Sequence, residues 1–182
     1  MKIFIFIFIL LAFNLDANIK QDMLNLYQNK QYKEACKMGF NNFKYKEQDE
    51  DFVSLYAFSC LHSDYIDRLA LPIAMLKLSS EARANSAYLS IILMQKKLLY
   101  HALVDNYNLS SLKLPSTDYV LSKVFDFYAA LGIHEQRDVY LFTDKQDEKL
   151  KYKLYLTNDR ELKKMVIEEF YNTIIIKKHT YW

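Results

Sequence analysis

Two cysteines, Cys36 and Cys60, are the only thiols in this chain of 182 residues. They are too far apart in the sequence to form the Cys-x-x-Cys pair of a thiol oxidoreductase. Their chemistry is therefore expected to be structural: either a disulfide bond, which an oxidising compartment favours, or two buried free thiols. The choice depends on the location of the protein and on the helices that carry the two residues.

The other residues capable of chemistry do not form a recognisable catalytic pattern. No histidine has a second histidine three or four residues away, as a helical metal site would require, and the G-x-S-x-G motif of serine hydrolases is missing from the sequence. Gly39 and Gly132 are too far apart to form a phosphate-binding loop. We therefore expect no catalytic residue, no metal site and no cofactor, with a site assembled from distant positions as the alternative. The four histidines are His62, His101, His134 and His179.

The first 17 residues have the layout of a secretory signal peptide. Lys2 provides a positive charge, residues 3–13 are continuously apolar, and Ala17 is a small residue at a suitable cleavage position. The apolar stretch is shorter than the roughly 20 residues that a helix needs to span a bilayer. We therefore expect an exported mature chain that begins near Asn18 and is periplasmic or secreted. It would have no stable membrane anchor after cleavage; an uncleaved anchor is the alternative.

The composition favours a helical protein that binds neither nucleic acid nor an anionic membrane. The formal net charge is only +2, which gives no electrostatic reason to expect such partners. Two glycines and two prolines are far fewer than the usual frequencies of about 7% and 5% would give. Because these residues interrupt helices, their scarcity indicates helices joined by short polar turns.

The stretch LYQNKQYKEAC, residues 26–36, has a distinctive spacing of aromatic and small residues. Tyr27 and Tyr32 are five residues apart, and Ala35 follows three residues after the second tyrosine. This spacing resembles the turn and second-helix start of a tetratricopeptide repeat, although Lys30 stands where that family usually has glycine. A small residue at the alanine position lets two antiparallel helices approach closely. Alanines recur near the family's period of about 34 residues, at Ala35, Ala70 and Ala102.

The resemblance implies a mainly α fold in which antiparallel helical hairpins stack as a tetratricopeptide-repeat-like array over residues 18–132. An irregular helical bundle is the alternative. The last helix of the array is the clearest, because residues 116–118 offer a cap and Gly132 supplies the stop. We expect helices at residues 19–29, 31–43, 49–61, 64–79, 81–95, 97–106 and 117–131.

The last fifty residues follow a different pattern. Residues 138–144 and 149–159 flank a charged turn, and the second stretch alternates apolar and polar side chains, as a half-buried strand does. Residues 160–172 then repeat apolar side chains at helical spacing, and residues 173–182 are rich in β-branched side chains. We therefore predict a small β-β-α-β appendage over residues 133–182, with a fully helical tail as the alternative.

The repeat register and the expected export together favour a disulfide. In a stacked array, Cys36 would lie on the second helix of the first hairpin and Cys60 on the first helix of the next hairpin, and these helices are neighbours. Export would place both thiols in an oxidising compartment. We therefore predict that Cys36 and Cys60 form a disulfide.

The resemblance also implies a function. Stacked helical hairpins usually expose a concave surface that binds proteins or peptides. We expect a non-enzymatic periplasmic adaptor or scaffold that binds other envelope proteins, for example within a flagellar motor or a secretion complex. Tyr27, Lys30 and Tyr45 are the candidate contact residues, although aromatic residues at helical spacing more often belong to a core. The alternatives are a structural cap or stalk subunit of a larger complex and an exported enzyme with a dispersed site; homo-oligomerisation is left open.

Overall fold

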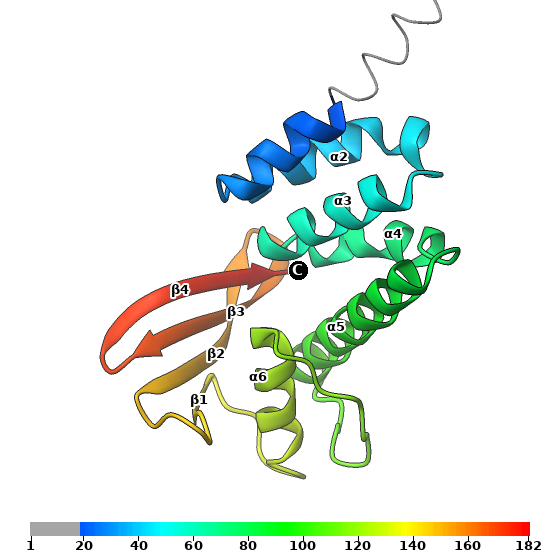
Figure 1. Ribbon diagram of the computed structural model, residues 1–182. Helices are drawn as coiled ribbons and strands as arrows, with labels where there is room; N and C mark the ends of the chain where they lie inside the picture. Colours follow the sequence, from blue (N-terminus) through cyan, green and yellow to red (C-terminus); the bar gives the residue numbers. More distant parts are fainter. Residues whose placement is uncertain (1–18) are drawn as a thin grey trace, which may run out of the picture. The chain divides into compact units, whose positions relative to one another are not determined.

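Helices come first and a sheet comes last along the chain (Figure 1). A computed structural model describes residues 19–182, so the expected signal peptide at residues 1–17 lies outside the described residues. The described residues form two compact units, which we name the first unit, up to Ser86, and the second unit, Ala87–Trp182. The domain boundary that the sequence predicts after Gly132 stays a prediction, because compactness alone does not show which segments fold independently.

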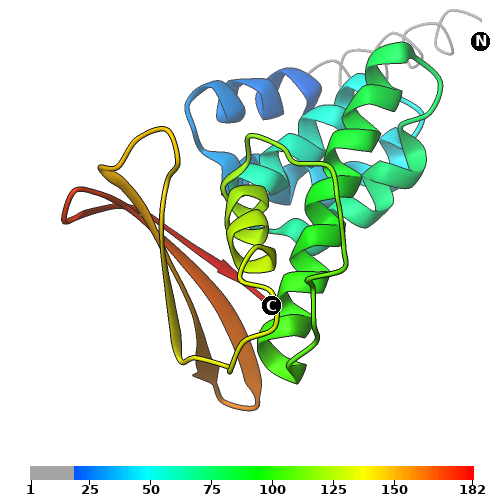
Figure 2. The same ribbon diagram turned by 90° about the horizontal axis from the view of Figure 1, so that it is seen from below.

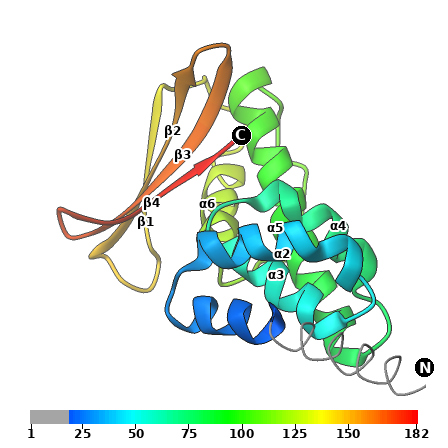
Figure 3. The same ribbon diagram turned by 90° about the horizontal axis from the view of Figure 1, so that it is seen from above.

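In the first unit, the first three helices follow one another in alternating directions, joined by short turns (Figure 3). The elements that follow the first helix, residues 19–28, are α2 (Tyr32–Lys46), α3 (Glu50–His62), the 3-10 helix η1 (Ile66–Leu69), α4 (Ala70–Met75) and α5 (Ser80–Asp105). Lys30 makes the first turn tight by adopting a left-handed backbone conformation, with φ of 59°. The first three helices agree with the ranges predicted from the sequence.

A glycine lets α2 and α3 approach each other closely. An atom added at the Cβ position of Gly39 would lie 2.4 Å from Cδ2 of Tyr56 on α3 and 2.8 Å from the Cβ and Cγ atoms of that side chain. Only a residue without a side chain fits between the two helices at this point. Ala35 and Cys36 are also buried on α2, so small residues form the surface against which α3 packs.

The single helix predicted at residues 64–79 is wrong, because a 3-10 turn precedes α4 and α4 is only six residues long. After α4, the N–H groups of residues 77–79 all donate to the carboxylate of Glu50, at 2.6–2.9 Å. The Leu78 N–H contributes most to lowering the pKa of Glu50 to about 2. These bonds stabilise a break before α5, where N–H groups would otherwise lack partners.

The continuous helix α5 replaces the third hairpin that the sequence predicts at residues 81–95 and 97–106. The polar stretch between those ranges is not a turn, because Gln95 is fully buried and its Nε2 donates to the Pro115 carbonyl at 3.0 Å. Glutamine and lysine are also good helix formers, so the helix continues through them. The prediction of a turn here is wrong, and a stacked repeat array stays a hypothesis.

The second unit combines helices with a four-stranded antiparallel sheet (Figure 2). The elements after α5 are α6 (Val120–Ala129), β1 (Val139–Thr143), β2 (Leu150–Asp159), β3 (Leu162–Tyr171) and β4 (Ile174–Tyr181). The strands lie side by side in the order β1-β2-β3-β4, so each is joined to the next by a hairpin. The hairpin predicted from residues 138–144 and 149–159 is confirmed, as is the final strand.

The helix predicted at residues 160–172 is wrong, because this segment forms the strand β3. Residues 165–167 are each at most 1% exposed, so β3 is covered on both faces. A strand buried in this way does not alternate apolar and polar residues, and its pattern can match that of a helix. The hairpin turns on either side contain no glycine; Arg160 and Asn172 adopt the left-handed conformation there, with φ of 57° and 55°. The appendage is therefore β-β-β-β.

One face of the sheet, the inner face, packs against α6 and the part of α5 that belongs to the second unit (Figures 1 and 2). The Phe127 ring of α6 stacks on the Phe142 ring of β1, with centroids 5.5 Å apart. The Tyr100 hydroxyl of α5 donates to the Lys163 carbonyl of β3 at 2.7 Å. Buried residues at matching positions on the four strands form this face: Tyr140, Leu154, Ile167 and His179.

Candidate protein-binding surface

The three predicted contact residues, Tyr27, Lys30 and Tyr45, do not come together in one site. Tyr27 is only partly exposed, because its ring packs against the rings of Tyr32 and His62, with centroids 5.1 and 5.8 Å away. Lys30 lies in the turn before α2, whereas Tyr45, which is 81% exposed, lies in the last turn of α2. Those two positions are about 20 Å apart along the helix, so a single small partner segment would not contact both.

The predicted disulfide between Cys36 and Cys60 is present, with the two Cα atoms 4.8 Å apart. Both residues are fully buried. Arg68 lies beside the bond: its Nη1 donates to Cys36 Sγ at 3.5 Å, and its guanidinium group lies over the rings of Phe40 and Tyr65. Because the two sulfur atoms are bonded to each other, neither can act as a nucleophile, and this cluster is structural.

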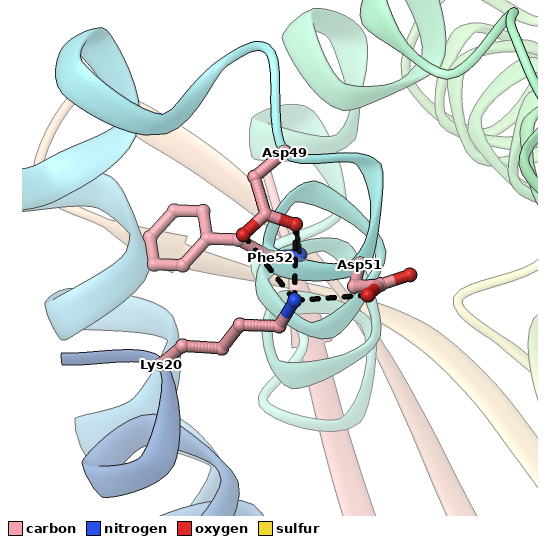
Figure 4. Close-up of polar contacts among 4 residues, drawn as sticks. All are labelled: Lys20, Asp49, Asp51 and Phe52. Atoms are coloured by element: carbon pink, nitrogen blue, oxygen red, sulfur yellow. Dashed lines mark hydrogen bonds and ion pairs between the residues drawn. The ribbon is translucent and has the colours of Figure 1, made fainter. Parts of the chain in front are cut away.

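A lysine of the first helix is bound by two carboxylates at the start of α3 (Figure 4). The Lys20 ammonium lies 3.1 and 3.2 Å from the two oxygens of Asp49 and 2.9 Å from Asp51 Oδ2. Asp49 also caps α3 by accepting a hydrogen bond from the Phe52 N–H at 3.1 Å. Burial alone would raise the pKa of Asp49, but the Phe52 N–H and the Lys20 ammonium lower it overall. The cluster therefore joins the first helix to the start of α3.

Two histidines of the second unit bind groups of the protein itself. His134 has its Nδ1 2.9 Å from the Gly132 carbonyl oxygen and its Nε2 3.2 Å from the Tyr140 hydroxyl. His179 is fully buried, with its Nε2 2.9 Å from Oε1 of Glu169. Within residues 19–182, no three His, Cys, Asp or Glu side chains are placed so that they could bind a metal ion together. These histidines therefore have a structural explanation.

A pocket of about 540 Å³ is lined by residues of α5, of the segment before β1 and of the sheet. Leu103 and Leu156 contribute apolar surface, while Arg137, Asp138 and Lys163 bring charges of both signs. Its lining contains no serine, cysteine or histidine. The pocket can hold a polar molecule, but it lacks the adjacent nucleophile and base of a hydrolytic site.

On the outer face of the sheet, a buried carboxylate lies between two lysines. Glu168 is 7% exposed and accepts a hydrogen bond from the Tyr155 hydroxyl at 2.7 Å. The ammonium groups of Lys153 and Lys178 lie 3.8 and 3.5 Å from its oxygens. Burial would raise the pKa of Glu168, but the Tyr155 hydroxyl and the two lysines lower it overall. Glu168 is therefore ionised at neutral pH, and two positive charges surround one negative charge.

Three exposed apolar residues lie together on the last strand of the sheet. Ile174, Ile175 and Ile176, at the start of β4, are 69%, 53% and 56% exposed. β4 is one of the two edge strands, with β1 at the opposite edge, and it pairs with β3 alone, so its other side presents backbone N–H and C=O groups without a strand partner. We name residues 174–178, the three isoleucines and the two lysines that follow them, the free β4 edge.

The free β4 edge belongs to a hairpin end that projects away from α5 and α6 (Figures 1, 2 and 3). The register of β4 on β3 shifts between Glu169 and Phe170, which leaves Ile176 without a partner on β3. Such a bulge bends and twists the strand. At its other end β4 is held to the helices, because the Tyr181 and Tyr119 hydroxyls lie 3.4 Å apart and the Lys96 ammonium donates to the Trp182 carbonyl. Residues 174–178 are exposed, whereas His179 and Tyr181 are buried, so the first part of β4 is its most accessible part.

Sequence reasoning identified the strand but not its role as an exposed edge. Three consecutive β-branched apolar residues followed by two lysines, IIIKK at residues 174–178, form an unusual run. On a half-buried strand such a run must expose at least one isoleucine, because successive side chains point to opposite faces. The run of three isoleucines was therefore the sequence signal that could have indicated an exposed apolar surface.

No protein-family model, no characterised protein and no solved structure matches this chain. Among residues 19–182, no helix combines the length and the apolar character needed to cross a bilayer. The functional assignment therefore depends on the geometry of the free β4 edge.

Proposed function

We propose that the protein is a non-enzymatic, exported adaptor that binds another protein of the bacterial cell envelope, and that the free β4 edge is its main contact surface. The observation that carries this proposal is the exposure of three adjacent isoleucines on an edge strand, one side of which has no strand partner. Exposed apolar side chains grouped on an open strand edge are typical of interaction sites. The apolar segment at residues 3–13 and the disulfide support export to an oxidising compartment.

The size of the surface indicates how such binding would work. Fully burying an isoleucine side chain is worth about 1.5–3 kcal/mol, so three side chains that are already partly buried would contribute on the order of 3–5 kcal/mol. Association of two proteins costs on the order of 4–15 kcal/mol in lost translational and rotational freedom. The isoleucines alone therefore do not hold a partner, and main-chain hydrogen bonds or a second contact must add to them.

A capture experiment with matched variants tests the proposal. The mature chain, tagged at its amino terminus, is incubated with extract of the native envelope, alongside a variant in which Ile174, Ile175 and Ile176 are all replaced by serine. Ile133→Ser is the control, because Ile133 is 88% exposed but lies outside the sheet. We expect the same partner with wild type and control and its loss with the triple variant. Equal recovery with all three proteins would contradict the proposal.

A further inference from the structure

We propose that the partner binds by adding an extended strand to the free β4 edge, and that this strand carries two carboxylates followed by apolar side chains. The inference rests on the adaptor function and names the chemistry of the partner segment. Adding a strand to an open sheet edge is an established way of recognising a peptide, with main-chain hydrogen bonds for affinity and side chains for specificity. It supplies the main-chain contacts that the three isoleucines lack.

The pairing of β4 with β3 shows which side chains suit this strand. Antiparallel to β4, β3 presents two glutamates to the two lysines and two aromatic residues to the isoleucines. The pairs are Glu168 with Lys178, Glu169 with Lys177, Phe170 with Ile175, and Tyr171 with Ile174. In an antiparallel sheet, alternate residues of β4 direct their backbone groups away from β3. An antiparallel strand on the free side of β4 therefore meets the same lysines and isoleucines that β3 meets. Such a strand binds best when its acidic and apolar residues follow the order found in β3.

The charges of the two lysines are not fully used within the chain. Lys178 lies 3.5 Å from Glu168 but is 53% exposed. Lys177 is exposed, and we find no hydrogen bond or ion pair of its side chain within the described part of the chain. A carboxylate directly opposite it on an added strand would be favoured, whereas a like charge would be disfavoured.

The same lysines disfavour a second copy of this chain as the occupant. Two copies that pair antiparallel over residues 174–178 would place Lys177 opposite Ile175 and Lys178 opposite Ile174 of the other copy, so neither lysine would meet a carboxylate. Parallel pairing in register would place each lysine beside its own counterpart, and like charges directly opposite each other destabilise a sheet. An acidic strand therefore fits this edge better than a second copy does.

The length of the added strand is limited. The bulge at Ile176 twists the edge, and the later part of β4 is tied to α5 and α6 through Trp182 and Tyr181. The added strand therefore pairs with residues 174–178. It runs antiparallel to β4, as β3 does, so its carboxylates come before its apolar residues in its own chain direction. An acidic-then-apolar extended segment is the partner chemistry that this edge fits.

Peptide binding with a charge swap tests the inference. The probe is a fluorescein-labelled peptide with the sequence of β3, residues 162–171, which contains the order Glu-Glu-Phe-Tyr. A second peptide has both glutamates replaced by lysine. Fluorescence anisotropy with the full mature protein should show binding of the first peptide. The second peptide should bind roughly threefold more weakly than the first, or weaker still, given the modest strength of cross-strand charge pairs. Lys177→Glu should remove most of this preference, while Lys113→Glu, a charge reversal at an exposed site outside the sheet, should not.

Amide hydrogen exchange locates the peptide. Protection of the backbone amides of residues 174–178 on peptide binding supports strand addition. Ile175→Lys should abolish both this protection and the increase in the anisotropy of the peptide. Three results would overturn the inference: no binding of the first peptide at millimolar concentration, a preference that Lys177→Glu leaves unchanged, or protein oligomers that Ile175→Lys dissociates, since these would place a second copy on the edge. The capture experiment described above stays independent, because it can succeed when the charge swap fails.

Discussion

Removing the disulfide should destabilise the protein by an amount that follows from the loop it closes. Cys36 and Cys60 are separated by 24 positions, so the bond closes a loop of 25 residues when both cysteines are counted. In the loop-closure model, this restricts the unfolded chain by an entropy worth about 3.5 kcal/mol at 25 °C. Replacing both cysteines by alanine removes the restriction and two buried sulfur atoms, which adds a smaller packing loss. We therefore expect the variant to lose about 3.5 kcal/mol or slightly more.

Thermal unfolding of the mature chain, followed by circular dichroism, measures this loss. In a domain of 150–250 residues, 1 kcal/mol changes the melting temperature by about 2–4 °C, and residues 18–182 are within this size. The oxidised wild type should therefore unfold about 7–14 °C above the double variant. A reductant should lower the wild type to slightly above the variant, because the two thiols stay in the core, and should leave the variant unchanged. Equal melting temperatures, or two reactive thiols in the denatured, unreduced wild type, would refute the reasoning.

Three further predictions concern the first unit. Because the pKa of Glu50 is lowered to about 2 in the folded state, wild type should lose stability as the pH falls from about 4.5 to about 2. The melting temperature of the Glu50→Gln variant should depend less on pH than that of wild type. An equal dependence on pH in both proteins would contradict the role of the carboxylate. Gly39→Ala should lower the free energy of unfolding, measured in urea, by about 1–3 kcal/mol, because the added Cβ would overlap Tyr56. An unchanged urea midpoint would show that α2 and α3 can move apart to fit the Cβ without a loss of stability. Asp49→Ala should lose about 1 kcal/mol with the cap of α3, whereas Asp51→Ala should lose less, and equal losses would argue against capping.

Local signals in the sequence were sufficient for several elements. The start of α3 could be predicted because Asp49 precedes an apolar helical stretch, and its carboxylate does cap that helix. The alternation over residues 150–156 identified β2, since one side of that strand faces the core. The disulfide could be anticipated because no third cysteine competes with Cys36 and Cys60. Each of these features depends on neighbours in the chain or on a simple count.

The errors arose where distant contacts override local pattern. Lys96 is only 2% exposed, because its ammonium reaches the Trp182 carbonyl, which a sequence pattern does not reveal. The segment 165–167 is buried on both faces of the sheet and so has lost the alternation of a strand. The proposed contact surface was missed for a related reason: whether residues 174–178 are exposed depends on β4 lying at an edge of the sheet, which is a property of the sheet order.

Under the proposed function, an open strand edge would also link the amount of this protein in the cell to the amount of its partner. Unpaired strand edges with apolar side chains template aggregation, and the bulge at Ile176 and the two lysines oppose this only in part. Molecules made in excess of the partner would therefore be removed by envelope proteases or precipitate, whereas occupied molecules would persist. Balanced synthesis of the two proteins would follow from the exposure of three isoleucines.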